Sequence, residues 1–485
     1  MIKDFNIKLV IKIISVFLFI ESILMLLSSL VSFIYKENDV FPLLASGIIS
    51  IIISLIALIF TGKEKGKINI RESFFSFTFL WIILSLFGTF PYLLTQAASF
   101  SDAFFESMSG FTTTGSSILT HIESFSKGLL FWRSSTQWLG GICFIVITLA
   151  VLPIVGTGGG MRTFSSEPIS FHLTKLRPRM ENSIMWLCVI YFSLTVFECV
   201  ALKIAGMDIF DAVCHSFSTI STGGFSTKTD SVGFWTSSSI RIIFIVFMFL
   251  SGVNFTLYFY LVTGKFRKII KDEELKYYVL FILFFSLIVA LGLFFTMNFN
   301  FFDSIDTAFF QITSVISTSG FSITETIHRT PFLHLVILIP MFFGASSGSA
   351  SGGIKTVRIM LILKNSVNEL KRFVHPNAIT PIKFNGKLIP LPIINNAFLF
   401  LLLYIFVVIA GVLFLSVLDI AFGDSVKIVL STVGNIGSAA SNHASLEGYE
   451  LLPAVGKYFL ALLMLIGRLE LYAFFVLFTR SFWRK

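Results

Sequence analysis

The run SGFTTTGSS, from Ser109 to Ser117, occurs four times in related form, and this repetition indicates the architecture of the whole chain. Each copy ends a moderately apolar stretch of about a dozen residues that opens with an aspartate and is too short to span a bilayer. From that aspartate to the aligned glycine the distance is 13, 13, 14 and 13 residues, which is an internal repeat. The other three copies are STISTGGFS (218–226), SVISTSGFS (314–322) and STVGNIGSA (431–439).

The sequence around these runs is that of an integral membrane protein. Of 485 residues, 55% are hydrophobic and only 13% are charged, whereas roughly a quarter of the residues in a soluble domain are charged. About ten apolar runs have the length that a spanning helix needs. They cover residues 9–34, 41–61, 73–95, 129–154, 183–205, 238–262, 277–298, 332–362, 396–418 and 455–479. The first run has no convincing signal-peptide cleavage site, so we interpret it as an uncleaved helix.

Basic residues gather in alternate loops, which predicts that both termini are cytoplasmic. These loops follow the second, fourth, sixth and eighth apolar runs, and they hold Lys63, Lys65, Lys67 and Arg71; Arg162, Lys175, Arg177 and Arg179; Lys265, Arg267, Lys268 and Lys271; and Lys364, Lys371, Arg372, Lys383 and Lys387. Topology therefore explains the net charge of +9, and we expect no binding of nucleic acid. The prediction from the residues is a multi-pass membrane protein with both termini in the cytoplasm.

The repeats predict an all-α membrane protein of four parallel units. Each unit has one spanning helix (M1), a short re-entrant helix (P) and a second spanning helix (M2), so successive units keep one orientation and surround a pseudo-fourfold axis. The first two helices stand outside this pattern. The predicted divisions are an N-terminal helix pair at 1–68 and repeats at 69–180, 181–272, 273–385 and 386–485.

The runs that end the short helices have the composition of a pore lining. They contain no acid and are rich in Gly, Ser and Thr, and non-helical backbone at membrane depth is tolerated where it is buried or lines a water-filled cavity. Four such runs on one axis would present rings of carbonyl oxygens to a monovalent cation. Small residues also mediate close helix packing, but four copies at matched spacing favour the pore.

The sequence resembles the TrkH and KtrB branch of the superfamily of K⁺ transporters, and it is most similar to TrkH-like members. The resemblance rests on the four runs and on FWRSSTQWLGG (131–141), GASSGSASGGIKTVR (344–358) and LIGRLEL (465–471). It implies K⁺-channel-like M1-P-M2 repeats, K⁺ uptake, a homodimer and a cytosolic nucleotide-binding (TrkA-like) regulatory ring. It also implies a place in the cytoplasmic (inner) membrane of a bacterium. The chain has no G-x-G-x-x-G run of its own, so such regulation requires the partner. No cofactor is expected beyond K⁺ as the permeating ion.

The resemblance also implies which residues form the K⁺ filter. Family members with Ser at the first filter glycine tend to pass Na⁺, and this chain has Gly115 there. The fourth run, GNIGS, departs most from the others. The filter positions are Thr113, Thr114 and Gly115; Thr222, Gly223 and Gly224; Thr318, Ser319 and Gly320; and Asn435, Ile436 and Gly437.

A run of Gly, Ser and Ala from Gly344 to Gly353 interrupts the eighth apolar segment. Glycine is unfavourable inside a helix, so the helix is expected to break there; a simple kink at a packing contact is the alternative. In the family such a break is an intramembrane gate loop below the filter. The corresponding positions are Gly344, Gly348, Gly352 and Gly353, with Lys355 just beyond them on the cytoplasmic side.

Arg468 lies inside the last apolar run, where a cation must be paired or face water. We expect it to face the pore, where it would raise the barrier to cations or contact the 344–353 loop. A pair with Glu470 is the alternative, although residues two apart project to different sides of a helix.

Other polar residues have simpler interpretations. Capping of the short helices is the first interpretation of Asp102, Asp211, Asp306 and Asp424, ahead of an outer cation funnel. Glu21 and Glu198 lie within apolar runs and are assigned no role. The four cysteines and the scattered histidines have no metal-ligand spacing.

Two other functions compete with a channel-like pathway. One is coupled symport of K⁺ with Na⁺ or H⁺, which depends on rates and gating. The other is an intramembrane enzyme, for which the sequence offers no nucleophile with a base and no metal cluster. A regulatory ring would dock on the basic cytoplasmic face, at Lys175, Arg177, Arg179, Lys268, Lys371 and Arg372.

Overall fold

In the part of the chain that the structure describes, the fold is all-α apart from one hairpin of two two-residue strands, and the sequence predicts this all-α class. The structure is a computed structural model that describes residues 5–62, 69–155, 180–297, 299–323, 330–377, 380–437, 449 and 452–483. Six helices in these ranges are long and apolar enough to cross a membrane, and a bent helix pair provides a seventh. The chain is therefore a multi-pass membrane protein.

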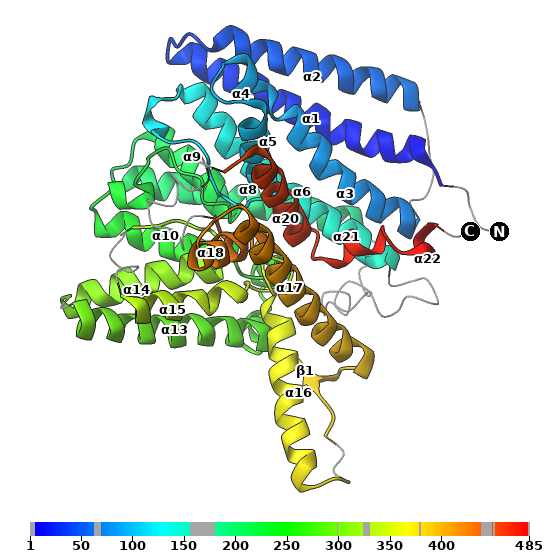
Figure 1. Cartoon of the computed structure of the whole chain (residues 1–485), viewed down its shortest axis with the longest axis vertical. Helices are drawn as coiled ribbons and strands as arrows, with labels where there is room; N and C mark the ends of the chain where they lie inside the picture. The colour runs from blue at the N-terminus through cyan, green and yellow to red at the C-terminus, as the bar shows by residue number, and fades with distance from the viewer. Residues whose placement is uncertain are drawn as a thin grey trace.

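Helices α1 (Ile7–Ile34) and α2 (Val40–Thr61) form an antiparallel pair beside the rest of the molecule (Figure 1). Small residues let the two helices approach closely: a methyl group added to Gly47 would lie 2.7 Å from Leu26 Cδ2. Glu37, in the turn between the helices, accepts hydrogen bonds from the backbone N–H groups of Lys127 and Gly128. The first N–H groups of a helix lack partners within the helix. The carboxylate of Glu37 therefore caps the helix that starts at Lys127.

The remaining helices occur in a recurring order of long helix, short helix and second long helix. The first unit holds α3 (Ile70–Phe87), α4 (Phe90–Leu94), α5 (Phe100–Phe111), η1 (Ile122–Ser124) and α6 (Lys127–Val155); the second holds α8 (Met180–Ile204), α9 (Ile209–Ile220), η3 (Ser231–Phe234), α10 (Ser238–Ser251), α11 (Phe255–Val262) and α12 (Phe266–Ile270).

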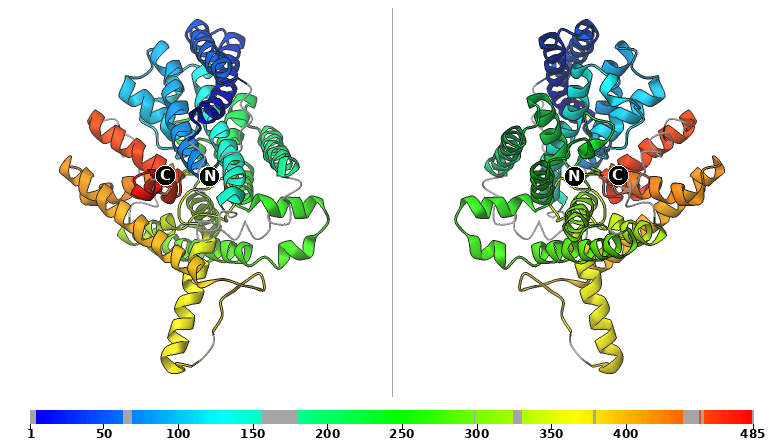
Figure 2. Two further views of the ribbon diagram at one scale, coloured as in Figure 1. Left: turned by 90° about the vertical axis from the view of Figure 1, so that its right-hand side faces the viewer. Right: turned by 90° about the vertical axis from the view of Figure 1, so that its left-hand side faces the viewer.

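The third unit holds α13 (Glu273–Met297), α14 (Phe301–Ile316), α15 (Pro331–Leu338), η5 (Pro340–Phe342) and α16 (Thr356–Val374), and the fourth holds α17 (Leu391–Val417), α18 (Phe422–Val433), α20 (Ala454–Arg468), α21 (Tyr472–Val476) and α22 (Arg480–Trp483). Between α16 and α17, β1 (Lys383–Phe384) pairs with β2 (Lys387–Leu388) in antiparallel register. In Figure 2 α16 and this hairpin extend away from the other helices.

The four short helices are α5, α9, α14 and α18, and each packs against a helix that follows the short helix of a neighbouring unit. Helix α9 contacts α6, α14 contacts α10, α18 contacts η5, and α5 contacts α20 at the end of the chain. The order of these contacts follows the order of the units and closes from the fourth to the first. The units are therefore arranged around one axis.

For two of the apolar runs, the prediction of one continuous spanning helix is wrong, because the helix is interrupted. The run 238–262 is two helices bent by 96°, with Gly252 ending α10 and the Asn254 side chain capping α11 at Thr256 N. The run 455–479 stops at Arg468, and the next residues, Glu470 and Leu471, have positive φ angles of 54° and 60°. Only α6, among the second long helices in the described residues, is continuous along its predicted run.

Candidate functional site

The four runs that follow the short helices have the same backbone conformation. The residue two before each aligned glycine has a φ between 51° and 61°, and the glycines have φ between 75° and 80°. Residues other than glycine rarely adopt such φ angles. The angles persist where the surrounding structure enforces them. The non-glycine residues are Thr113, Thr222, Thr318 and Asn435.

A matched hydrogen bond closes each of these turns. The N–H just before the aligned glycine donates to the carbonyl of a serine five residues earlier, at 2.8 to 2.9 Å. A serine at this place in all four runs is visible in the sequence. The donor and acceptor residues are Thr114 and Ser109, Gly223 and Ser218, Ser319 and Ser314, and Ile436 and Ser431.

The four runs meet in a closed ring. A methyl group added to any of the four glycines would collide with the carbonyl oxygen of the residue before the glycine in the next run. The distances are 1.8 Å from Gly115 to Gly223 O, 1.8 Å from Gly224 to Ser319 O, 1.9 Å from Gly320 to Ile436 O and 2.4 Å from Gly437 to Thr114 O. The structure thus brings together all twelve of the positions that the sequence singled out.

The ring is suited to a weakly hydrated monovalent cation. Its twelve residues are buried and none is charged, so the polar groups there are backbone groups, small hydroxyls and the Asn435 amide. The short helices end at the ring, and the C-terminal end of a helix has a partial negative charge. Carbonyl oxygens in such rings replace the hydration shell of an ion.

The fourth run differs from the others because the side chain of Asn435 bonds directly to another run of the ring. Asn435 Nδ2 donates to Thr114 Oγ1 of the first run at 2.8 Å and to the carbonyl of Met464 at 3.1 Å. An amide thus replaces the threonine found at this position in the other three runs. It ties the last run to the first.

Residues Gly344 to Gly353 form a buried, non-helical loop between η5 and α16. Its two ends lie side by side, since Gly344 N donates to Ile354 O at 2.8 Å. Gly352 N donates to Thr318 Oγ1 at 2.9 Å, and a methyl group on Gly352 would lie 2.4 Å from Gly434 O. The loop therefore contacts two of the four runs of the ring.

The middle of the loop is held by a residue at the start of its own unit and by one from the second unit. Glu274, at the start of α13, accepts hydrogen bonds from Ser347 N at 2.5 Å and Ser347 Oγ at 2.9 Å. Phe255 N, at the bend after α10, donates to Gly348 O at 3.2 Å. Sequence reasoning missed both Glu274 and this bend. The acid stands at the start of an apolar run, where an interfacial position is the ordinary interpretation.

Lys355 is buried and turns back toward the loop. Its ammonium donates to the carbonyl and hydroxyl oxygens of Ser351. Its side chain is 1% exposed, so it does not extend into the cytoplasm as a solvated cation would. Lys355 and the loop therefore form one packed unit.

Arg468 is 1% exposed and ends α20. Its Nη1 donates to the carbonyl of Ala350 in the loop at 2.6 Å, and its guanidinium lies 4.1 Å from the centre of the Phe144 ring. Glu470 pairs instead with Arg358 at 2.6 Å. The Arg468–Glu470 pair considered from the sequence is therefore not formed.

The capping interpretation of the four aspartates is wrong. The N-caps of the short helices are Ser99, Asp208, Asn300 and Ala421. The aspartates lie inside the helices and pair with cations, because the helices start earlier than the repeat alignment suggests. The pairs are Asp102 with Lys457, Asp211 with Lys228, Asp306 with Arg241 and Asp424 with Lys427.

Several residues named from the sequence lie outside the described ranges. These are Lys63, Lys65, Lys67, Arg162, Lys175, Arg177 and Arg179, together with two of the scattered histidines, His328 and His443. Within the described part of the chain, no group of three or more His, Cys, Asp or Glu residues could hold a metal ion. Glu21 and Glu198 are buried in α1 and α8.

A multi-pass protein with four helix ends around an uncharged carbonyl ring has the design of a cation-transport protein. The family model of TrkH, described as a cation transport protein, matches residues 41–485. The chain belongs to this family, which is the Trk-system potassium uptake family. It is thus a transporter and not an enzyme.

Individual relatives are similar over nearly their whole length. The potassium uptake protein TrkH of Salmonella typhimurium is 36% identical, with 95% of this chain and 96% of the relative covered. TrkG of Escherichia coli is 30% identical over 96% of both chains. The crystal structure of the potassium transporter TrkH from Vibrio parahaemolyticus matches with a TM-score of 0.89 and 31% identity, covering 99% of this chain and 100% of that one.

Proposed function

We propose that the chain mediates K⁺ uptake by channel-like permeation through the ring of filter residues 113–115, 222–224, 318–320 and 435–437. The closed ring of contacts between the four glycines and the next run's carbonyls supports this most directly. The names of the relatives, which are potassium uptake proteins, agree with it. K⁺ would bind to backbone carbonyls there.

A flux assay tests this proposal. The full chain reconstituted in liposomes should pass K⁺ and Rb⁺ in preference to Na⁺ and Li⁺, because the ring offers carbonyls and no carboxylate. Equal flux of all four ions would contradict a selective filter. Reversal potentials that depend on an imposed Na⁺ or pH gradient would instead indicate coupled symport.

We also propose that the loop 344–353 obstructs the pathway and that Arg468 supports this state. The loop lies against Thr318 and Gly434 of the filter runs, and Arg468 holds its Ala350 carbonyl. A guanidinium at this depth adds an electrostatic barrier for a cation. Obstruction and barrier would thus act at the same place.

Arg468→Ala should increase K⁺ flux by about fivefold. One positive charge in a narrow, partly screened path repels K⁺ by about 1 kcal/mol, which corresponds to that factor. Flux and melting temperature of the reconstituted variant should be measured together. Lower flux with lost stability would show that Arg468 is only a structural residue.

A TrkA-like nucleotide-binding ring is the partner that we propose for the basic inner face, with the chain as a homodimer in the inner membrane and both termini cytoplasmic. The relatives are named as parts of a Trk system, which implies more than one component. Within the described residues this face includes Lys268, Lys371 and Arg372, all exposed; Lys175, Arg177 and Arg179 would extend it.

Reversing the charge of Lys268, Lys371 and Arg372 to Glu should weaken binding of the TrkA-like ring several-fold, because complementary charge favours association. Binding of the purified ring to detergent-solubilised protein is the measurement. Lys36→Glu, an exposed change in the turn between α1 and α2, is the control for altered charge elsewhere. Undiminished binding would remove the three residues from the interface.

A further inference from the structure

Each short helix has a residue nine positions before its filter glycine, which we call the anchor. The residue two positions after the glycine we call the exit residue. The anchors are Glu106, His215, Gln311 and Ile428, and all four are buried. The exit residues are Ser117, Ser226, Ser322 and, outside the described residues, Ala439.

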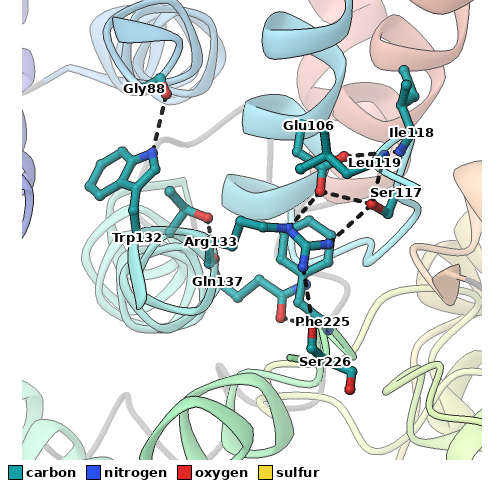
Figure 3. Close-up of polar contacts among 11 residues, drawn as sticks. Gly88, Glu106, Ser117, Ile118, Leu119, Trp132, Arg133, Gln137, Phe225 and Ser226 are labelled. Carbon is teal, nitrogen blue, oxygen red and sulfur yellow. Dashed lines mark hydrogen bonds and ion pairs between the residues drawn. The ribbon is translucent and has the colours of Figure 1, made fainter. Parts of the chain in front are cut away.

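In the first unit, the anchor holds the extended segment that leaves the filter. We call this segment, in each unit, the exit strand, although it is not part of a β-sheet. Ser117 Oγ donates to Glu106 Oε1 at 3.0 Å, and the backbone N–H of Ile118 donates to Glu106 Oε2 at 3.0 Å. Figure 3 shows both contacts. A carboxylate that accepts from the strand at two points fixes the height of that strand above the helix.

In the second unit, a histidine makes the matching contact. His215 Nδ1 lies 2.8 Å from the carbonyl of Asp211, and its Nε2 lies 3.0 Å from Ser226 Oγ. A carbonyl only accepts, so Nδ1 carries the hydrogen and the Nε2 of a neutral ring accepts from the serine hydroxyl. Anchor and exit residue are thus bonded in both units, with different chemistry.

Arg133 of α6 joins the two units behind the filter (Figure 3). Its Nε donates to Glu106 at 2.8 Å and its Nη2 to Ser117 Oγ at 3.1 Å, while its Nη1 donates to the carbonyl of Ser226 at 3.1 Å. The side chain is 1% exposed, and charge-assisted bonds of this kind are strong. One buried guanidinium therefore ties both exit strands to the same helix.

Gln137 extends this tie by one helical turn. Residues four apart lie on one face of a helix, and Gln137 Oε1 accepts the backbone N–H of Phe225 at 3.0 Å. Phe225 directly follows the filter glycine of the second unit, and its ring lies 4.1 Å from the Arg133 guanidinium. One face of α6 thus holds the second strand at two consecutive residues.

The fourth unit lacks the chemistry for such a bond. Ile428 and Ala439 have no polar side-chain atoms, and the anchor and the exit residue are thus both apolar in the same unit. Serine is the exit residue wherever the anchor can hydrogen-bond. The strands around the filter are therefore not held equally.

We propose that Glu106, His215 and Arg133 are positioning residues that fix the first two filter strands and thereby set the preference for K⁺ over Na⁺. This inference rests on the proposed function of the ring. Na⁺ is smaller than K⁺, so carbonyls must move inward to coordinate it, and strands anchored from behind resist that movement. The discrimination depends on supports outside the filter as well as on its carbonyls.

Glu106→Gln tests the proposal with little change in shape. An amide offers one acceptor oxygen where the carboxylate accepts from three donors, so at least one bond to Ser117, Ile118 or Arg133 is lost. The Na⁺/K⁺ permeability ratio of the full chain in liposomes should rise by about tenfold or more, in line with the loss of one hydrogen bond to a charged group. Glu21→Gln, at a buried acid of α1 outside the four units, is the matched control and should leave the ratio unchanged.

Ser117→Ala is the second variant if Glu106→Gln does not assemble, because it removes one hydroxyl and leaves the Glu106–Arg133 pair in place. An unchanged permeability ratio in an assembled variant overturns the proposal. If Glu106→Gln and Glu21→Gln both lower the melting temperature and neither changes the permeability ratio, Glu106 has only a structural role and the proposal is likewise overturned. A parent protein without preference for K⁺ would refute the function of the ring itself, which is a separate result.

Discussion

Gly115→Ser is expected to raise the Na⁺/K⁺ permeability ratio by about tenfold or more. A Cβ at this residue would lie 1.8 Å from the carbonyl oxygen of Gly223, and the φ of +80° is unfavourable for serine. Strain of about 1–3 kcal/mol in such a conformation corresponds to a factor of about 5 to 150, with tenfold near the lower end. The strain can be relieved only by moving a carbonyl of the ring. Ion-replacement measurements on the reconstituted protein would show the change.

Gly386→Ser is the matched control for this experiment. Gly386 has nearly the same φ, +77°, but no atom lies within 4 Å of the position that a Cβ would take. The control carries the backbone strain without the collision and should keep the parent's selectivity. If Gly115→Ser assembles normally and retains the parent's ratio, the assignment of Gly115 to the filter is wrong.

Removing Ser346 to Ala350 should raise K⁺ flux about tenfold in the absence of any partner. If the loop obstructs the pathway most of the time, the open fraction rises by such a factor when the obstruction is removed. The geometry favours a short closure, because a methyl group on Gly344 would lie 2.2 Å from Gly352 O, so the ends of the loop are already adjacent. The deletion joins Ala345 to Ser351 and keeps the contact of Ser351 with Lys355.

Glu274→Gln provides a milder test of the same gate. It keeps the loop at full length and weakens only the two hydrogen bonds from Ser347. Its flux should lie between those of the parent and the deletion variant. If the deletion abolishes flux in a protein that still assembles, the loop is a required lining and not a gate.

Matched spacing predicted the parts of the site that depend on local chemistry. The glycine and serine positions of the four runs could be aligned because each turn needs a left-handed residue and a closing bond to the same serine. The break at Gly344 to Gly353 was predictable as well, since a whole run of small residues cannot remain helical.

The remaining features depend on partners that are distant in the sequence. The bend after Ser251 involves one glycine and one asparagine cap, and the end of α20 coincides with a pair between Glu470 and Arg358, 112 residues apart. Glu106 and Arg133 are 27 residues apart, and no local pattern connects them. The prediction that the aspartates are N-caps failed because acids are also favoured inside the first turn of a helix. The residue type alone therefore does not determine where each helix begins.

The continuity of α6 beside three interrupted counterparts among the described helices has an evolutionary consequence. A pore made of four identical subunits must repeat every substitution four times, so a change that breaks one wall breaks all of them. Here the four units around the ring are encoded separately in one polypeptide. A mutation can therefore introduce a loop at 344–353 or a bend at Gly252 in one quarter, while the quarter that holds Arg133 remains a straight support. Encoding the four units in one polypeptide thus allows the units around the ring to be selected independently of one another.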